Sequence, residues 1–256
     1  MSDFDRNLAA ARTGYRADRV AIDAGLRAYM IRVYNYMAAG VALTGVVSWL
    51  TYQAAGGDSI QVAGNRIIGL TAFGQAIFGG PLTIILFLGT LGLVFYMSFR
   101  INRLQPSTAL GLFMLYSGLL GLMLSSVFLT YTGTSITRVF FISAASFGAL
   151  SLYGYTTQRD LSPIGLFLVM GLFGLIIAML VQMFLHSPGL SFLISVVGVL
   201  IFAGLTAWDT QQIKEMYDVQ DDGTVAGRKA VMGALRLYLD FINLFLMLLR
   251  LMGDRR

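Results

Sequence analysis

Seven long apolar runs divide this chain, and each is close to the ~20 residues that a helix needs to cross a bilayer. They cover approximately residues 33–52, 81–99, 107–130, 138–155, 161–185, 189–208 and 231–252. The runs are continuous and do not alternate between polar and apolar residues, which favours helices over the strands of a membrane barrel. The sequence therefore predicts an all-α fold, an integral membrane bundle of seven transmembrane helices.

The overall composition excludes the soluble alternatives. Residues of the apolar set make up 57% of the 256, and charged residues only 12%, about half the roughly 25% of a soluble domain. A water-soluble core cannot hide that much apolar surface, and a disordered chain needs low hydropathy and high charge. The 29 glycines fit a bundle in which helices approach one another closely.

The sequence lacks the residues that several kinds of catalytic and metal-binding site require. The chain has no cysteine and one histidine, His186, which argues against disulfides, thiolate metal sites and a Ser-His-Asp triad. Both lysines flank the apolar runs, so neither is placed to carry a retinal Schiff base. No nucleophile elbow, zinc-protease or Walker motif is present. We therefore expect no enzyme activity and no resident cofactor, and we interpret the net charge of +5 as topology information rather than as a nucleic-acid-binding surface.

The segments outside the runs are polar. Residues 1–27 are predicted to be a cytoplasmic tail, either lying on the membrane as a surface helix or mobile, and residues 28–256 form the transmembrane domain. The connector 54–80 is interpreted as an outer loop or a short re-entrant segment. The connector 209–230 is strongly charged.

Lysine and arginine counts indicate the orientation, because short cytoplasmic loops are enriched in both. With the N-terminus inside, the inner side receives Arg6, Arg12, Arg16, Arg19, Arg27, Arg32, Arg100, Arg103, Arg159, Lys214, Arg228 and Lys229. The outer side receives Arg66, Arg138, Arg250, Arg255 and Arg256. The count of 12 against 5 favours a cytoplasmic N-terminus. The basic C-terminus fits this poorly unless the seventh run fails to cross.

Two acidic residues are too costly in a membrane to be incidental. Asp240 lies about ten residues into the seventh run, about 15 Å deep at 1.5 Å per residue. Asp209 lies at the end of the sixth run, and both approach from the same side. Two carboxyl groups in a low-dielectric site cannot easily both ionise, so they titrate as a coupled unit.

Such a pair suits a pH-sensitive latch, closed by a hydrogen bond when protonated and opened by repulsion when ionised. It also suits a cation site, since carboxylate oxygens bind Ca²⁺. Structural alternatives remain open: Asp240 as an interhelical hydrogen-bond group, and Asp209 as a cap of the connector that follows. Arg236 stands one turn before Asp240, where an i,i+4 ion pair is available, and Asn243 shares that face.

Four segments carry a family resemblance. They are VYNYMAAGVALTG in the first run, SLYGYTTQRDLSPIGLFLVMGLFGLIIAML from the fourth into the fifth, TAWDTQQIK in the sixth and LYLDFINLFLMLLRLMG in the seventh. Over roughly residues 28–252 the chain resembles the Bax inhibitor-1 (transmembrane Bax inhibitor motif) family, in its bacterial YccA-like branch.

The resemblance implies a seven-helix bundle with the last helix at its centre, and a pH-sensitive Ca²⁺ leak. Asp209 and Asp240 match the family's proton-sensing pair. A basic latch residue at the inner end of the second helix is also implied, here Arg100 or Arg103. Arg236 departs from the family pattern, which implies a small or neutral polar residue at that position. A cation there would hold Asp240 ionised and repel an entering cation.

The resemblance also supplies the expected location and partners. It implies a multi-pass protein of the bacterial inner membrane, whose partners are the lipid bilayer, Ca²⁺ and protons. The alternative function is a non-transporting regulator that binds a membrane protease or stress and cell-death machinery, with the tail 1–27 as the contact. An intramembrane protease is the least favoured interpretation, because Asp209 and Asp240 lie outside the motifs of the aspartyl enzymes.

Overall fold

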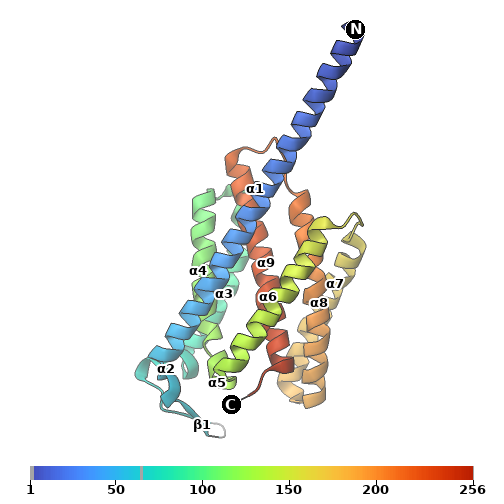
Figure 1. Cartoon of the computed structure of the whole chain (residues 1–256). Helices are drawn as coiled ribbons and strands as arrows, with labels where there is room; N and C mark the ends of the chain where they lie inside the picture. Colours follow the sequence, from blue (N-terminus) through green and yellow to red (C-terminus); the bar gives the residue numbers. More distant parts are fainter. Residues whose placement is uncertain (1–2, 64–65, 256) are drawn as a thin grey trace.

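A computed structural model describes residues 3–63 and 66–255, apart from the side chains of residues 3–23, 61–63, 66–67, 81 and 102. Helices dominate the described part, and seven of them are long and apolar enough to cross a membrane (Figure 1). The long helices are α1 (Asp3–Ala54), α3 (Pro81–Arg100), α4 (Pro106–Leu124), α6 (Gly133–Thr156), α7 (Ser162–Leu185), α8 (Pro188–Glu215) and α9 (Gly223–Met252). The predicted all-α bundle of seven spans is confirmed.

Helix boundaries differ from the apolar runs where polar residues remain helical. Helix α8 extends to Glu215 and α9 begins at Gly223, so the connector predicted at 209–230 shrinks to residues 216–222. The carboxylate of Asp222 accepts a hydrogen bond from the Val225 N–H and caps α9. The third run is broken, because the chain turns at residues 125–126 between α4 and the short α5 (Val127–Thr130).

The connector 54–80 is folded rather than an open loop. It contains the 3₁₀ helix η1 (Gly57–Ser59), the strands β1 (Gln61–Ala63) and β2 (Arg66–Ile68), and the helix α2 (Ala72–Gly79). The strands pair antiparallel, with Val62 opposite Ile67. Sequence analysis did not predict this hairpin, because three-residue strands carry too little periodic signal.

Helix α9 is the centre of the bundle. In its most apolar stretch 72% of the residues are buried, against 11% in α3 and in α7. It packs against α1, α4, α6 and α8, while α3 lies mainly on α4 and α7 mainly on α8. The expectation of a central last helix is therefore confirmed, with four of the other six helices forming its principal packing partners.

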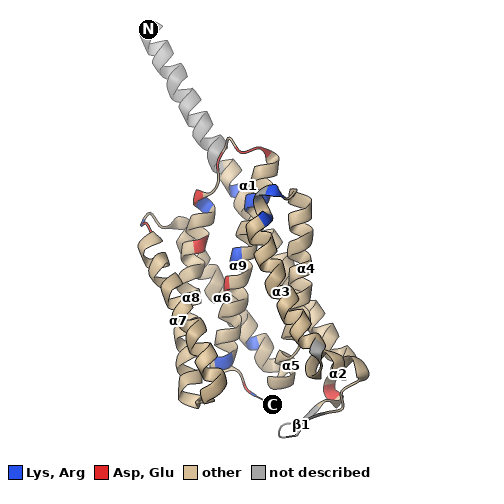
Figure 2. Cartoon of the chain, turned by 180° about the vertical axis from the view of Figure 1, so that it is seen from behind, with Lys and Arg blue, Asp and Glu red and all other residues tan. Residues whose placement is uncertain are grey.

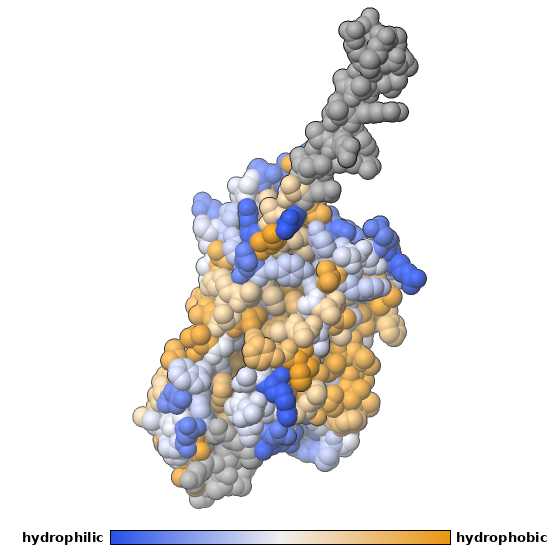
Figure 3. Space-filling view, in the orientation of Figure 1, coloured by the Kyte–Doolittle hydropathy of each residue, from blue (hydrophilic) through white to orange (hydrophobic). Residues whose placement is uncertain are grey.

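The outer helices present the surface that the bilayer would cover. Apolar residues occupy the middle of the face seen in Figure 3, with hydrophilic residues toward both ends. On α7 the exposed large side chains include Ile164, Phe167, Met170, Phe173, Ile177 and Leu180. Charged residues gather at the two ends of the bundle, and few lie between them (Figure 2). This arrangement matches a helical protein surrounded by lipid.

The two ends of the chain lie at opposite ends of the bundle (Figure 1). Helix α9 therefore runs the whole length of the bundle, and an incomplete last span does not account for the basic C-terminus. The side chains of residues 3–23 lie outside the description, so both interpretations of the tail 1–27 stay predictions.

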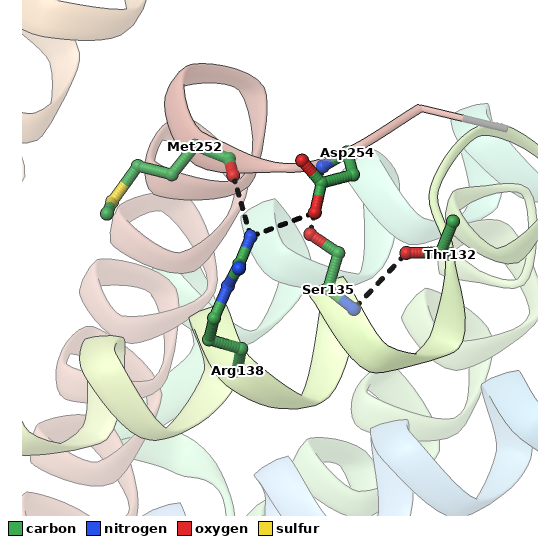
Figure 4. Close-up of polar contacts among 5 residues, drawn as sticks. All are labelled: Thr132, Ser135, Arg138, Met252 and Asp254. Atoms are coloured by element: carbon green, nitrogen blue, oxygen red, sulfur yellow. Dashed lines mark hydrogen bonds and ion pairs between the residues drawn. The ribbon is translucent and has the colours of Figure 1, made fainter.

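The C-terminal segment is tied to the start of α6 (Figure 4). The Arg138 guanidinium lies 3.0 Å from the Asp254 carboxylate and donates a longer bond to the Met252 carbonyl. The Asp254 N–H donates to the Ser135 hydroxyl, and the Thr132 N–H donates to the Asp254 carbonyl. Because both Arg138 and Asp254 are more than half exposed, the backbone bonds hold this segment more firmly than the ion pair does.

Helices α6 and α8 meet at a glycine. A Cβ added at Gly154 would lie 2.1 Å from the Ala207 carbonyl oxygen, an atom of the α8 backbone that cannot rotate away. Gly148, on the same helix, has no atom within 4 Å of the equivalent position. The close approach at Gly154 fixes the position of the α8 turn that carries Asp209.

We predict that Gly154→Ala lowers the free energy of unfolding by about 1–3 kcal/mol, because the methyl group overpacks a backbone contact. Gly148→Ala is the matched control, and its better helix propensity should leave stability unchanged or raised by up to about 1 kcal/mol. Thermal unfolding of the purified proteins in one detergent measures both. Equal midpoints for the two variants would contradict the packing at Gly154.

Candidate site at the Asp209–Asp240 pair

Asp240 lies in the middle of the central helix. Its residue is 5% exposed, and the Oδ2 atom is buried without a hydrogen-bond donor. Phe241 and Leu237 beside it on α9 are also buried. A carboxyl group in such surroundings is costly unless a proton or a polar neighbour compensates, and the residue is therefore a candidate functional group.

Asp209 meets Asp240 from the neighbouring helix. It lies six residues before the end of α8, so it is inside the helix and does not cap the following connector. Its side chain is 15% exposed. The two carboxyl groups are close enough for the charge on one to act on the other. The structure thus brings together the two acids that the sequence singled out.

Arg236 pairs with Asp209 and not with its own-helix neighbour Asp240. Its Nη1 lies 3.9 Å from Asp209 Oδ1, so the ion pair joins α9 to α8. The i,i+4 pair considered from the sequence is replaced by this interhelical one, because α8 packs along the face of α9 that carries both residues. The Arg236 side chain is 37% exposed, so it is partly solvated.

Of the other residues predicted to act here, Asn243 lies one turn after Asp240 on α9, and Arg100 and Arg103 lie outside α8 and α9. The Asn243 amide donates to the Leu239 carbonyl on its own helix, 2.8 Å away. Arg100 ends α3, and Arg103 ends the 3₁₀ helix η2 (Ile101–Arg103); both are exposed. Within the described part of the chain, the cation paired with Asp209 is Arg236.

A chain of hydroxyl groups adjoins Asp209, and sequence analysis did not identify it. The Tyr34 and Ser151 hydroxyls share a hydrogen bond of 2.5 Å, and Ser151 shares another of 2.9 Å with Thr210. Thr210 donates to the Thr206 carbonyl one turn back. The chain links α1, α6 and α8, and Tyr34 and Ser151 also line an open groove of about 560 Å³ between α1 and α6.

The polar residues that follow Asp209 hold a loop. The Gln211 side chain accepts from the Leu161 N–H and donates to the Arg159 carbonyl, each at 2.8 Å. Lys214 Nζ donates to the Tyr155 carbonyl at 2.9 Å. These bonds join α8 to the last turn of α6 and to the connection between α6 and α7. The TAWDTQQIK segment therefore combines one acid of the pair with the residues that position its helix.

A buried tyrosine fixes the opposite side of α9. The Tyr238 hydroxyl lies 2.6 Å from Thr44 Oγ1, which itself donates toward the Ser117 carbonyl. The Tyr238 ring packs edge-on against Phe113 and Tyr116 of α4. This cluster joins α1, α4 and α9. The charged residues Arg236 and Asp240 lie on the other face of α9, toward α8. The signal for it in the sequence is only a tyrosine among apolar residues.

A double-mutant cycle tests the assignment of Arg236. Arg236→Gln and Asp209→Asn should be non-additive in unfolding free energy by about 1 kcal/mol, because each removes the same partly exposed ion pair. Arg100→Gln and Arg103→Gln serve as matched controls and should each add to Asp209→Asn without coupling. Coupling of Asp209 to Arg100 or Arg103, with none to Arg236, would place the latch on α3 instead.

Comparison with known proteins identifies the family of this chain. The family model described as inhibitor of apoptosis-promoting Bax1 matches residues 26–256. The inner membrane protein YbhL of Escherichia coli is 43% identical over 235 residues, which cover 91% of this chain and 94% of YbhL. An uncharacterized protein of Rickettsia prowazekii, RP147, is 48% identical over 234 residues, 91% of this chain and 92% of its own length. An uncharacterized Caulobacter vibrioides protein is 40% identical over the full length of both chains. The chain belongs to the Bax inhibitor-1 family.

Proposed function

We propose that this chain is a pH-sensitive cation leak, with Ca²⁺ as the permeant ion, gated by Asp209 and Asp240. The observation that carries the proposal is the close approach of two electrostatically coupled carboxyl groups from adjacent helices inside a lipid-facing bundle. Such a contact has little structural value that an apolar pair would not supply more cheaply. Its particular property is that it gains and loses a proton as one unit.

The charge of the cluster determines the direction of the pH effect. With one proton shared by the two aspartates, and Arg236 beside them, the cluster is neutral and the hydrogen bond joins α8 to α9. Loss of that proton leaves two adjacent carboxylates and one guanidinium, a net charge of −1. Repulsion then separates the helices and the negative charge attracts a cation. Cation flux is therefore expected to rise with pH.

Arg236 replaces the latch that the family resemblance led us to expect from α3. It balances one negative charge in the closed state and opposes entry of a cation. A second proton at low pH would leave it unpaired, with a net charge of +1, and would suppress cation flux further. Arg236 is thus proposed to modulate the pH range, while Asn243 contributes by its place on the same face of α9.

The pair is proposed as a point of passage for Ca²⁺ and not as a storage site. Ca²⁺ takes six to eight oxygen ligands. The described part of the chain offers no group of three or more acidic or histidine side chains that could hold a metal ion. Two carboxylates would exchange with only some of the ion's water ligands and would release it readily. The proposal includes no catalysed reaction and no resident cofactor.

We further place the chain in the bacterial inner membrane with its N-terminus in the cytoplasm. Support comes from the seven apolar helices, the lysine and arginine distribution, and the inner-membrane relative YbhL. On this orientation the connection 216–222 and the ion pair Lys229–Asp221 are cytoplasmic. Asp209 and Arg236 then lie toward the cytoplasmic end of the pathway.

The test is Ca²⁺ flux into proteoliposomes between pH 5 and pH 8. Flux through the wild type should rise with pH, by up to about tenfold per pH unit for one titrating proton. Asp240→Asn cannot lose that proton, so its flux should be independent of pH. Asp160→Asn is the matched control, because the Ser162 N–H bonded to Asp160 holds the pKa of that exposed carboxyl below its usual range. Asp160 is ionised throughout this window, so its replacement should leave the pH dependence intact.

Two results would contradict the proposal. A pH-dependent flux that persists in Asp240→Asn would remove the pair as its sensor. Absence of flux at every pH would favour the alternative function, a non-transporting regulator that binds a membrane protease or stress and cell-death machinery. In that case the Asp209–Asp240 contact would be a structural hydrogen bond.

A further inference from the structure

A polar pocket lies at the end of the bundle that holds the end of α9, away from the aspartate pair. Its volume is about 310 Å³, and it lies between the end of α7, the start of α8 and the end of α9. The polar residues that line it are Gln182, His186, Ser191, Ser195, Arg250 and Arg255. None of them belongs to the site described above.

Among the described residues, those that line the pocket include two arginines and no acid. Asp254 is the acid adjacent in sequence, but it is paired with Arg138 at 3.0 Å. No ion pair to an acid of the described chain involves Arg250 or Arg255. Guanidinium groups without an acidic partner are suited to bind an oxyanion through paired N–H bonds.

The helix beside the arginines adds to the same preference. Helix α8 has 28 residues, and its N-terminus, which carries a partial positive charge, opens on the pocket. The first helical residue is Pro188, which has no N–H to satisfy.

The rim of the pocket is apolar and faces outward. Phe192 lines the pocket and is 62% exposed, and Phe184, near the end of α7, is 83% exposed. Both lie where α7 ends and α8 begins, which is the depth at which a membrane helix leaves the hydrocarbon and meets the headgroup layer. An anion bound here would sit at the level of lipid phosphates, within reach of dissolved anions as well.

We propose that this pocket binds a phosphate-bearing anion, held by the guanidinium groups of Arg250 and Arg255 beside the N-terminus of α8. The chemistry is common to the phosphate of an anionic phospholipid headgroup and to inorganic phosphate. The site is independent of the Asp209–Asp240 pair, which lies toward the opposite end of α8.

The experiment measures binding of two probes to the purified full-length protein in maltoside micelles. One arm adds phosphatidylglycerol and counts retained lipid by native mass spectrometry; the other adds inorganic phosphate and follows heat by titration calorimetry. Arg250→Gln and Arg255→Gln should each weaken binding about tenfold, the value of one charge-assisted hydrogen bond. Arg159→Gln removes an exposed positive charge at the other end of the bundle and should bind as the wild type does.

Lipid retention that depends on Arg250 and Arg255, without phosphate binding, assigns the pocket to a headgroup; phosphate binding with the same dependence assigns it to a dissolved anion. Binding of neither probe to the wild type overturns the proposal, and so does binding by both arginine variants that is as strong as that of the wild type. If the arginine variants unfold, binding is measured with Ser191→Glu instead. A carboxylate placed in the pocket should repel the anion, so this variant should bind more weakly than the wild type. Undiminished binding by that variant also overturns the proposal.

Discussion

The carboxyl group of Asp240 has to be accommodated at the centre of a bundle in which neither lipid nor bulk water can solvate it. Three features of the chain make this achievable: α9 is surrounded by four other helices, α8 places a second carboxyl group beside the first, and Arg236 supplies a cation to that second group. Each feature limits the others. Helix α8 can be neither rotated nor shifted by one turn without leaving Asp240 as a lone acid in an apolar environment.

The rest of the bundle holds α8 in that position. Gly154 lets α6 approach the α8 backbone, and Gln211 and Lys214 bind the connection between α6 and α7. On the far side of α9, the Tyr238 cluster ties the central helix to α1 and α4. The contact that joins the acids is therefore supported by rigid neighbours. A gate that opens there needs only a small separation of α8 from α9.

Much of this arrangement could be predicted from the sequence, and the reason is membrane physics. Long apolar runs identify membrane-spanning helices reliably, because other segments are not stable in the hydrocarbon core of a bilayer. The cost of burying an acid there singles out Asp209 and Asp240. The ends of α8 and α9 were misplaced because polar residues such as Gln211 and Lys214 remain helical beyond the apolar window. The partner of Arg236 was missed because sequence spacing reports neighbours on one helix and not across two. The hydroxyl chain of Tyr34, Ser151 and Thr210 depends on three helices at once, so no local pattern signals it.

The central claim is that Asp209 and Asp240 share a proton in the closed bundle, and infrared spectroscopy of the purified protein in lipid tests it most directly. The account predicts a band of a protonated, hydrogen-bonded carboxyl group at neutral pH, which disappears as the pH rises and is absent from Asp240→Asn. A spectrum that contains only ionised carboxylates at neutral pH, or a protonated band that survives unchanged in Asp240→Asn, would contradict the claim.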